Sequence, residues 1–364
     1  MTAPPRGPVP TPVQAARAAA RRRRWREPEP WLRAACVALV AVVPLAVPSF
    51  QITDLAIKIA IFAALVASYD VLLGFTGIVS FGHAMFFGFG AYAVALGVGK
   101  TGTTGYGALL AGFALGAVVA LTISLVISAF SLRVKAIFFA MITLAFAEFA
   151  LILAVQWSAF TGGEDGLSPK LPGVFAVGWS GRFLGVPLTG RLVTYYVVLA
   201  LCVALFALMS RFVRSPLGRT LQAIRDNALR AEALGVRTFV FQTIAAAFAS
   251  VVASLLGGGY AMWVRYVNPE SALGIPIMLD ILLMVIIGGI GTLWGGIVGA
   301  TVLLSAQTLL PGLRTLGARV FAGSDLAQRL TERWLLYFGI LFVLVVFFFP
   351  KGVLGTLRHR ARRS

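Results

Sequence analysis

Three acidic residues interrupt long apolar stretches of this chain, namely Asp70, Glu148 and Asp280. A carboxyl group costs several kcal/mol in lipid, so such residues line a polar path, pair with a buried arginine, or lie close enough to the interface to be solvated. The sequence leaves these roles open for all three. Asp54 differs, because Lys58 follows it by four residues, and that spacing allows the two side chains to pair on one face of a helix.

The histidine and cysteine content does not favour catalysis or metal binding. His83 lies in the segment FGHAM, the other histidine is in the tail, and Cys36 and Cys202 both lie in apolar stretches. A lone histidine is more often a hydrogen-bonded structural residue than a ligand, and no metal-ligand spacing is present. No Ser/His/Asp set, HExxH motif or carboxylate pair occurs at a usable spacing. We therefore expect no metal, no cofactor and no enzymatic activity.

One apparent nucleotide motif is a false lead. The segment 99–101 (GKT) imitates the end of a phosphate-binding P-loop, but Val94 stands where its first glycine belongs. An apolar helix is expected before this segment, whereas a P-loop follows a strand. The chain is therefore not expected to bind ATP itself.

Composition indicates a polytopic membrane protein. The chain of 364 residues is 59% hydrophobic and 12% charged, with a mean hydropathy of +0.91. Its apolar runs approach the ~20 residues that a membrane-crossing helix needs, and no alternating barrel pattern is visible. We predict an all-α fold of about ten transmembrane helices, with the eighth and ninth open to being one re-entrant element: Ala34–Phe50, Ile52–Leu73, Ala84–Gly99, Ala108–Phe130, Ala136–Trp157, Leu192–Phe212, Phe239–Met262, Ile275–Gly289, Ile297–Leu310 and Trp334–Phe349.

The basic residues give an orientation for these spans. A net charge of +18 would suggest a nucleic-acid surface in a soluble chain, but here lysines and arginines gather at the ends of apolar runs. With both termini cytosolic, the cytosolic side carries 21 of them and the opposite side nine. We expect a disordered basic arm at 1–33, a membrane domain at 34–350 and a basic tail at 351–364. A cleaved signal peptide is the rival interpretation of the start, but no cleavage site is visible.

Two loops stand out between the spans. The cytosolic loop 213–237 is predicted to hold one amphipathic helix, with Ser215 as N-cap, Pro216 as its first residue and Gly235 as the left-handed residue that ends it. Its apolar face would rest on lipid headgroups or form part of a docking helix for a cytosolic partner. The external loop 158–191 is broken by glycine and proline and is predicted to be a small lid or docking surface.

Five segments together resemble one family. In chain order they are GFTGIVSFGHAMFFGFGAYA (74–93), TGGEDGL (161–167), SPLGRTLQAIRDNALRAEALGV (215–236), VIIGGIGTLWGGIVGA (285–300) and PKGVLG (350–355). They are similar to the LivM-type permease subunits of branched-chain amino-acid ABC importers. The resemblance extends from about residue 50 to the end of the chain. It implies an inverted-repeat importer fold in which segment 215–236 couples to an ATPase.

The coupling segment departs from the general importer pattern. That pattern, Glu-Ala-Ala, three residues and Gly, would put Glu-Ala-Ala at 229–231 before Gly235, but this chain has Leu-Arg-Ala there and Glu232 after it. Gly235 therefore carries over, whereas no individual charge does. Within this segment, the candidate residues for ATPase coupling are Leu217, Gly218, Arg219, Leu221, Ile224, Arg225, Glu232 and Gly235.

Two glycine-rich stretches, 74–90 and 288–299, are candidates for the transport path. Glycine-interrupted spans supply polar backbone near the membrane midplane in transporters, although glycines also simply let helices approach closely. The candidate path residues are Ser80, Gly82, His83, Gly289 and Gly291. In the external loop, TGGEDGL is either a plain turn or a docking site for a substrate receptor, formed by Gly162, Gly163, Glu164 and Asp165.

The resemblance implies a function and a set of partners. The chain would be a permease subunit in a bacterial inner membrane that imports leucine, isoleucine or valine. It would assemble with two cytosolic ATP-binding subunits, a second homologous permease subunit and a periplasmic substrate-binding protein. Relatives of the family also carry urea, short amides and aromatic acids, so the substrate stays open. A secondary transporter that uses Asp70, Glu148 or Asp280 for a proton or sodium ion is the main alternative.

Overall fold

The computed structural model describes residues 30–46, 49–100, 105–131, 136–176, 178–183 and 186–309, together with a few residues between 339 and 352. Contacts divide the chain into two compact units, 1–42 and 43–364. Helix α2 (Pro30–Ala46) begins four residues before the expected first span and supplies the described part of the first unit. The site and the fold discussed below belong to the second unit.

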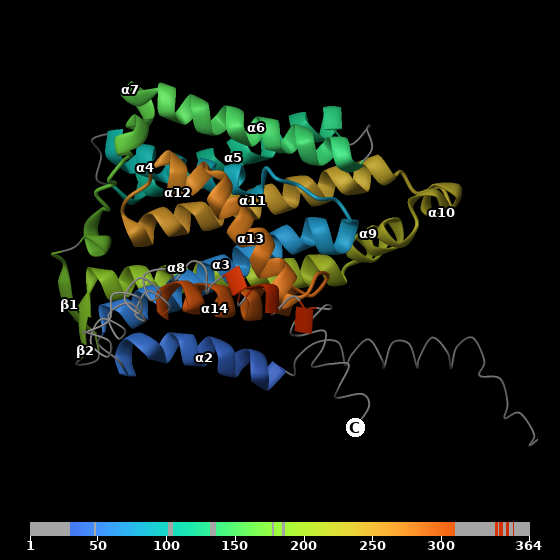
Figure 1. Cartoon of the computed structure of the whole chain (residues 1–364). Helices are drawn as coiled ribbons and strands as arrows, with labels where there is room; N and C mark the ends of the chain where they lie inside the picture. The colour runs from blue at the N-terminus through green and yellow to red at the C-terminus, as the bar shows by residue number, and fades with distance from the viewer. Residues whose placement is uncertain are drawn as a thin grey trace, which may run out of the picture. The chain divides into compact units, whose positions relative to one another are not determined.

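The second unit is a bundle of apolar helices (Figure 1). Within the described ranges, six helical segments are long and apolar enough to cross a membrane, and α4 and α14 are shorter apolar helices. The chain is thus an all-α polytopic membrane protein, as predicted. The main helices are α3 (Phe50–Thr76), α4 (His83–Lys100), α5 (Tyr106–Ser131), α6 (Ala136–Gln156), α8 (Gly190–Arg214), α11 (Thr238–Val264), α12 (Pro269–Leu273), α13 (Ile275–Gly288) and α14 (Leu293–Leu309).

Nine of the ten predicted spans coincide with helices, within a few residues at their ends. The first differs most, because Phe50 was assigned to it but opens α3 instead. The tenth, Trp334–Phe349, lies largely outside the described residues. The eighth and ninth are two separate helices, α13 and α14, which pack along each other and are joined by a short link at 289–292.

The loops lie at two opposite ends of this bundle (Figure 1). One end carries α7 (Ser158–Thr161), the 3-10 turns η1 (Gly163–Asp165) and η2 (Gly173–Phe175), and an antiparallel hairpin of β1 (Ser180–Phe183) and β2 (Val186–Thr189), in which Ser180 faces Thr189. The other end carries α9 (Pro216–Asp226) and α10 (Ala228–Ala233). Helix α8 connects the two ends, and its 25 residues rise about 37 Å, enough to cross a bilayer.

Close packing of small residues holds α4 against α11. A β-carbon added to Gly90 would overlap the carbonyl oxygen of Ser254, and one added to Gly257 would overlap the carbonyl oxygen of Phe87. In lipid, where apolar burial drives helix association weakly, such backbone approach supplies much of the packing energy. At Gly90 the close-approach interpretation of the glycine-rich stretch is therefore confirmed.

The substitution Gly257→Ala is expected to destabilise the bundle, because the new methyl group must push α4 away from α11. Overpacking of this kind costs about 1–3 kcal/mol, so the melting temperature of the purified protein in detergent should fall by several degrees. Gly107→Ala is the matched control, since a β-carbon there would meet no described neighbour within 4 Å. Equal melting temperatures for the two variants would contradict this account of the α4–α11 contact.

Candidate functional site

Helix α9 begins where the sequence predicts. Ser215 is its N-cap, with the side-chain Oγ accepting a hydrogen bond from the backbone N–H of Gly218 at 3.3 Å, and Pro216 is the first helical residue. Gly218 is buried, and a β-carbon there would overlap the carbonyl oxygen of Val213. The chain can therefore fold from the end of α8 into α9 only with glycine at this position.

The predicted single helix is wrong, because it is broken at Asn227. This residue has extended backbone angles (φ −162°, ψ 103°), closes α9, and accepts a hydrogen bond through Oδ1 from the backbone N–H of Arg230 at 2.9 Å. It thus acts as the N-cap of the short helix α10. Asparagine is among the best N-cap residues, so Asn227 in the middle of the segment was the signal that could have revealed the break.

Gly235 ends α10 in the left-handed conformation, with φ +83°, as predicted. Its N–H donates to the carbonyl of Glu232 at 2.8 Å, and the N–H of Val236 donates to the carbonyl of Ala231 at 3.1 Å. The side chain of Glu232 accepts from the hydroxyl of Thr238 at 2.6 Å, which ties the end of α10 to the start of α11. A β-carbon at Gly235 would meet no described atom within 4 Å, so the requirement for glycine is conformational.

The apolar face of α9 packs on the protein itself. Leu221 and Ile224 are buried, and Leu221 belongs to a cluster with Leu72 of α3 and three alanines of α11, Ala245, Ala246 and Ala249. Leu217 is half-buried. This contact argues against a helix that rests its apolar face on lipid headgroups. Leu221, Ile224 and Gly218 hold α9 on the bundle and do not face outward.

The outward surface of this loop is different from the predicted set. Four of the predicted coupling residues are exposed: Arg219 and Arg225 on α9, Glu232 on α10, and Gly235 just after α10. Two leucines that sequence reasoning missed are the most exposed apolar residues here, Leu229 at 79% and Leu234 at 80%. Because α10 protrudes beyond α9 at the end of the bundle, these leucines lie at the tip of the loop (Figure 1).

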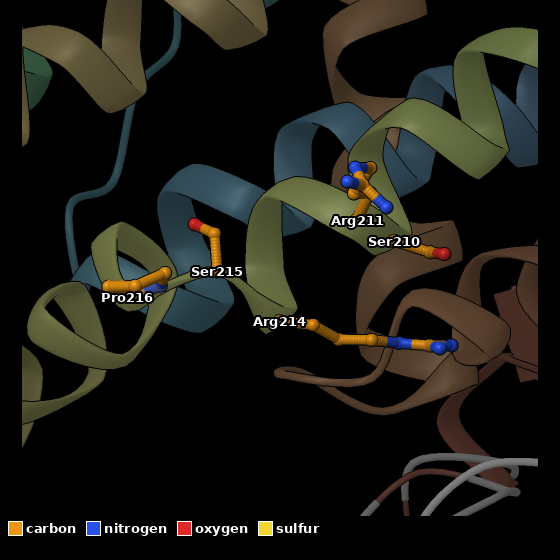
Figure 2. Close-up of a pocket in the computed structure, with 5 residues that line it drawn as sticks. All are labelled: Ser210, Arg211, Arg214, Ser215 and Pro216. Atoms are coloured by element: carbon orange, nitrogen blue, oxygen red, sulfur yellow. The ribbon is translucent and has the colours of Figure 1, made fainter.

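A cavity of ≈ 390 Å³ lies at the bend from α8 into α9. Figure 2 shows Arg211 and Arg214 on the last turn of α8 and Ser215 and Pro216 at the bend; Ser210 completes the lining. Arginines in the last turn of a helix complement its dipole, and basic residues at the end of a span favour the cytosolic side. Arg211 and Arg214 are thus placed as the positive-inside rule expects for a loop on the cytosolic side.

A polar junction joins α9 to two glycine-rich segments. The Nη1 atom of Arg225 donates a hydrogen bond to the carbonyl of Gly74 in the last turn of α3. One turn earlier in α3, Oδ1 of Asp70 accepts from the backbone N–H of Gly291 at 2.7 Å, although the two residues are 221 positions apart. Asp70 is only 2% exposed, and Gly291 has a positive φ of 81°. Asp70 is thus hydrogen-bonded within the structure by a backbone N–H, a partner that the sequence did not suggest.

The candidate path residues form two separate groups. Ser80, Gly82 and His83 are buried at the start of α4, whereas Gly289 and Gly291 lie in the α13–α14 link. Among the described residues, no side-chain hydrogen bond joins one group to the other. A β-carbon on Gly352 would overlap the Cα of Gly289, so Gly352 packs on the link.

His83 has a structural partner. Its Nε2 lies 2.8 Å from the hydroxyl of Ser68 on α3, two turns before α3 ends. The connecting segment 77–82 is therefore non-helical backbone that runs back along α3. Its backbone is satisfied in part by α6, since the N–H of Phe81 donates to Oγ1 of Thr143 at 3.0 Å.

Two other carboxyl groups in the apolar helices, those of Asp54 and Asp280, also have hydrogen-bond or ion-pair partners. Asp54 pairs with Lys58 at 2.8 Å, as predicted, and accepts from the indole of Trp263 at 2.8 Å. Asp280 accepts from the amide of Gln307 at 3.1 Å, and Glu148 is half-buried. In the part of the chain that the structure covers, no group of three or more His, Cys, Asp or Glu side chains could hold a metal ion.

The TGGEDGL turn at the opposite end is compact. Gly162, Gly163 and Gly166 all have positive φ, which confirms the expectation for the first two, and Glu164 and Asp165 are exposed. The turn is fixed to the α11–α12 connection. Leu167 pairs with Val267 as an isolated antiparallel bridge, and the hydroxyl of Tyr266 donates to the carbonyl of Asp165 at 3.0 Å.

Arg265 anchors another part of the loop 158–191. Its Nη2 donates to the carbonyl of Phe175 at 2.7 Å. Burial lowers the pKa of the Arg265 guanidinium below its ordinary value, and the nearby positive charge of Arg191 lowers the pKa further. Arg265 has a left-handed φ of 58°. The loop is thereby held at a fixed place above α11.

Comparisons with known proteins agree with this architecture. A family model described as "Branched-chain amino acid transport system / permease component" matches residues 51–346. The chain is 28% identical to the high-affinity branched-chain amino acid transport system permease protein LivM of Escherichia coli over 353 residues, which covers 89% of this chain and 76% of that protein.

Two further relatives carry similar names. LivM of Salmonella typhimurium is 27% identical over 333 residues, covering 85% of this chain and 71% of the relative. The permease protein BraD of Pseudomonas aeruginosa is 26% identical over 317 residues, covering 81% and 91% respectively. No solved structure gives a significant match. On the strength of the family model, which spans most of the sequence, this polytopic chain belongs to the family of branched-chain amino acid transport system permease components.

Proposed function

We propose that this chain is a permease subunit of an ATP-driven ABC importer in a bacterial inner membrane, with both termini in the cytosol. Its partners are two cytosolic ATP-binding subunits, a second homologous permease subunit and a periplasmic substrate-binding protein. The transported compounds are leucine, isoleucine and valine, in line with the names of the relatives. The observation that carries the proposal is the protruding α9–α10 loop.

The α9–α10 loop has the properties of a docking element for a soluble protein. Its inner face is fixed by Leu221 and Ile224, whereas Leu229 and Leu234 project at the tip. Exposure of leucine side chains to water is unfavourable, and their burial under a partner protein is favourable. Arg219 and Glu232, both exposed, add charges of opposite sign that orient the partner. Such a surface suits an ATP-binding subunit that presses on the permease from the cytosol.

A zwitterionic amino acid needs a path lined by protein. Moving an ammonium and a carboxylate through hydrocarbon unpaired would cost many kcal/mol, so polar backbone must replace water along the path. The non-helical segments 77–82 and 289–292 offer such backbone between apolar helices. We assign Ser80, Gly82 and His83 to one side of the path and Gly289 and Gly291 to the other.

The opposite end of the bundle suits the substrate-binding protein. Glu164 and Asp165 are exposed on a turn that glycines and Tyr266 hold rigid. A rigid acidic turn loses little entropy on binding and attracts a basic patch on a partner. Gly162 and Gly163 set the shape of the turn, and the two carboxylates provide the contact.

Reconstituted vesicles test the function directly. The complex purified with its ATP-binding subunits should transport radiolabelled leucine only under two conditions. ATP must be present on the side of the membrane that holds the ATP-binding subunits, and the loaded binding protein must be on the opposite side. Uptake should persist after a protonophore is added, because no ion gradient drives it. Uptake that collapses with the protonophore while ATP stays high would favour a secondary transporter and contradict the proposal.

The substitution Gly235→Val is expected to uncouple ATP hydrolysis from uptake. A β-branched residue is strained at φ +83° by about 1–2 kcal/mol, so the end of α10 must rearrange although space is available. Membrane insertion and ATPase activity should remain, and the uptake rate should fall several-fold. Gly235→Asn is the control, because asparagine tolerates the left-handed conformation. Normal uptake by the valine variant would remove α10 from the coupling mechanism.

The substitution Leu229→Asp should release the ATP-binding subunits. Leu229 is 79% exposed, so the change leaves the permease fold intact but puts a charge into the proposed apolar contact. We expect a loss of ATP-binding subunit on co-purification, with an unchanged melting temperature of the permease. Glu164→Lys, at the other end of the bundle, should keep the ATP-binding subunits and weaken stimulation by the binding protein. Retention of those subunits by Leu229→Asp would show that the tip of the loop is not the contact.

A further inference from the structure

Arg225 is exposed on α9, yet its guanidinium group turns inward to the bundle. It reaches across to the carbonyl of Gly74, in a residue 151 positions earlier in the chain. A β-carbon on Gly77 would lie 3.4 Å from its Cγ, and a β-carbon on Gly291 would lie 2.9 Å from its Nη1. The side chain therefore packs over the end of α3 and beside the α13–α14 link at the same time.

The carbonyl that Arg225 binds is a natural acceptor for a cation. Gly74 is in the last turn of α3, where carbonyls lack partners within the helix and the helix dipole is negative. Helix α3 then closes at Gly77, which has a left-handed φ of 76°. Arg225 thus caps α3 from another helix.

Asp70 extends the same junction to the α13–α14 link. Its Oδ1 accepts from the N–H of Gly291, which lies in the link. A β-carbon on Gly74 would overlap Asp70 Oδ1 and lie 2.5 Å from the nitrogen of Gly291. The contact therefore requires glycine at 74, and the last two turns of α3 hold α9 through a carbonyl and the link through a carboxylate.

The nature of these contacts distinguishes them from the rest of the α9 interface. The cluster around Leu221 is apolar and non-directional, so α9 could tilt or slide on it at low cost. The hydrogen bonds of Arg225 and Asp70 are directional, and leaving the buried Asp70 without its partner costs about 1–3 kcal/mol, more if it is charged. Movement of α9 is therefore transmitted to α3 and to the α13–α14 link together.

We propose that Arg225 and Asp70 form the positioning junction that carries movement of α9 to both non-helical segments of the transport path. Segment 77–82 follows directly from the end of α3, and Gly289 and Gly291 are in the link itself. Arg225 thereby acts on the path through Gly74 and Asp70 and does not touch the transported compound. This inference rests on the proposed ATP-driven function of the chain.

The test compares ATPase activity and leucine uptake in the intact reconstituted complex. Arg225→Ala and Asp70→Ala should each keep the ATP-binding subunits and the hydrolysis of ATP, while uptake per ATP hydrolysed falls about tenfold or more. Asp70→Asn should restore much of the coupling, because an amide Oδ1 still accepts from the N–H of Gly291. Arg225→Lys should be intermediate, since an ammonium reaches Gly74 without the guanidinium fork.

A matched control comes from α13. Asp280→Asn removes another carboxyl group within a membrane helix, one that accepts a hydrogen bond from Gln307 and does not contact Arg225 or Asp70. Uptake per ATP hydrolysed should therefore equal that of the unmodified complex. Wild-type uptake per ATP in Arg225→Ala would overturn the inference and leave the proposed function standing. Loss of the ATP-binding subunits from Arg225→Ala would also overturn it, because Arg225 would then be a docking contact.

Two outcomes remain to be separated. If Arg225→Ala is not recovered as folded protein, the test rests on Arg225→Lys and Asp70→Asn. Full coupling in Arg225→Lys, together with no recovery of coupling in Asp70→Asn relative to Asp70→Ala, would overturn the proposed junction. If the unmodified permease never retains an ATP-binding subunit, the proposed function itself fails. Failure of the proposed function is thus visible in the wild-type complex, whereas failure of the junction is visible only in the variants.

Discussion

The need to satisfy every backbone polar group without water governs this structure. Helices meet that need internally, whereas segments 77–82 and 289–292 must find partners in neighbouring elements. Thr143 of α6 supplies one to Phe81, and Asp70 of α3 supplies one to Gly291. Interruptions in the helices of a membrane protein are therefore held by specific side chains, and those side chains determine which elements move together.

This constraint links the two ends of the molecule to its interior. At one end of the bundle, α9 is fixed by an apolar cluster and by Arg225, while α10 projects beyond it. At the other end, the TGGEDGL turn is fixed to the α11–α12 connection through Val267 and Tyr266. Both surfaces are fixed where they join the bundle and exposed beyond it, which suits the proposed contacts with a soluble ATPase at one end and a soluble receptor at the other.

Local signals in the sequence were sufficient for the helices and their caps. The apolar runs predicted the spans, Ser215 and Pro216 predicted the start of α9, and Gly235 predicted the end of α10, because each depends on a few neighbouring residues. The break at Asn227 was missed although its N-cap chemistry was visible. The partner of Asp70 could not be predicted, since Gly291 is 221 residues away and meets it only through tertiary packing.

The most direct test of the central claim is site-specific crosslinking in native membranes. A photoreactive phenylalanine analogue at position 229, at the exposed tip of α10, is irradiated in cells that carry out uptake, and the adduct is identified by mass spectrometry. The account predicts an adduct with an ATP-binding subunit from position 229 and none from position 164, at the opposite end of the bundle. Active uptake without such an adduct from position 229 or 234 would contradict it.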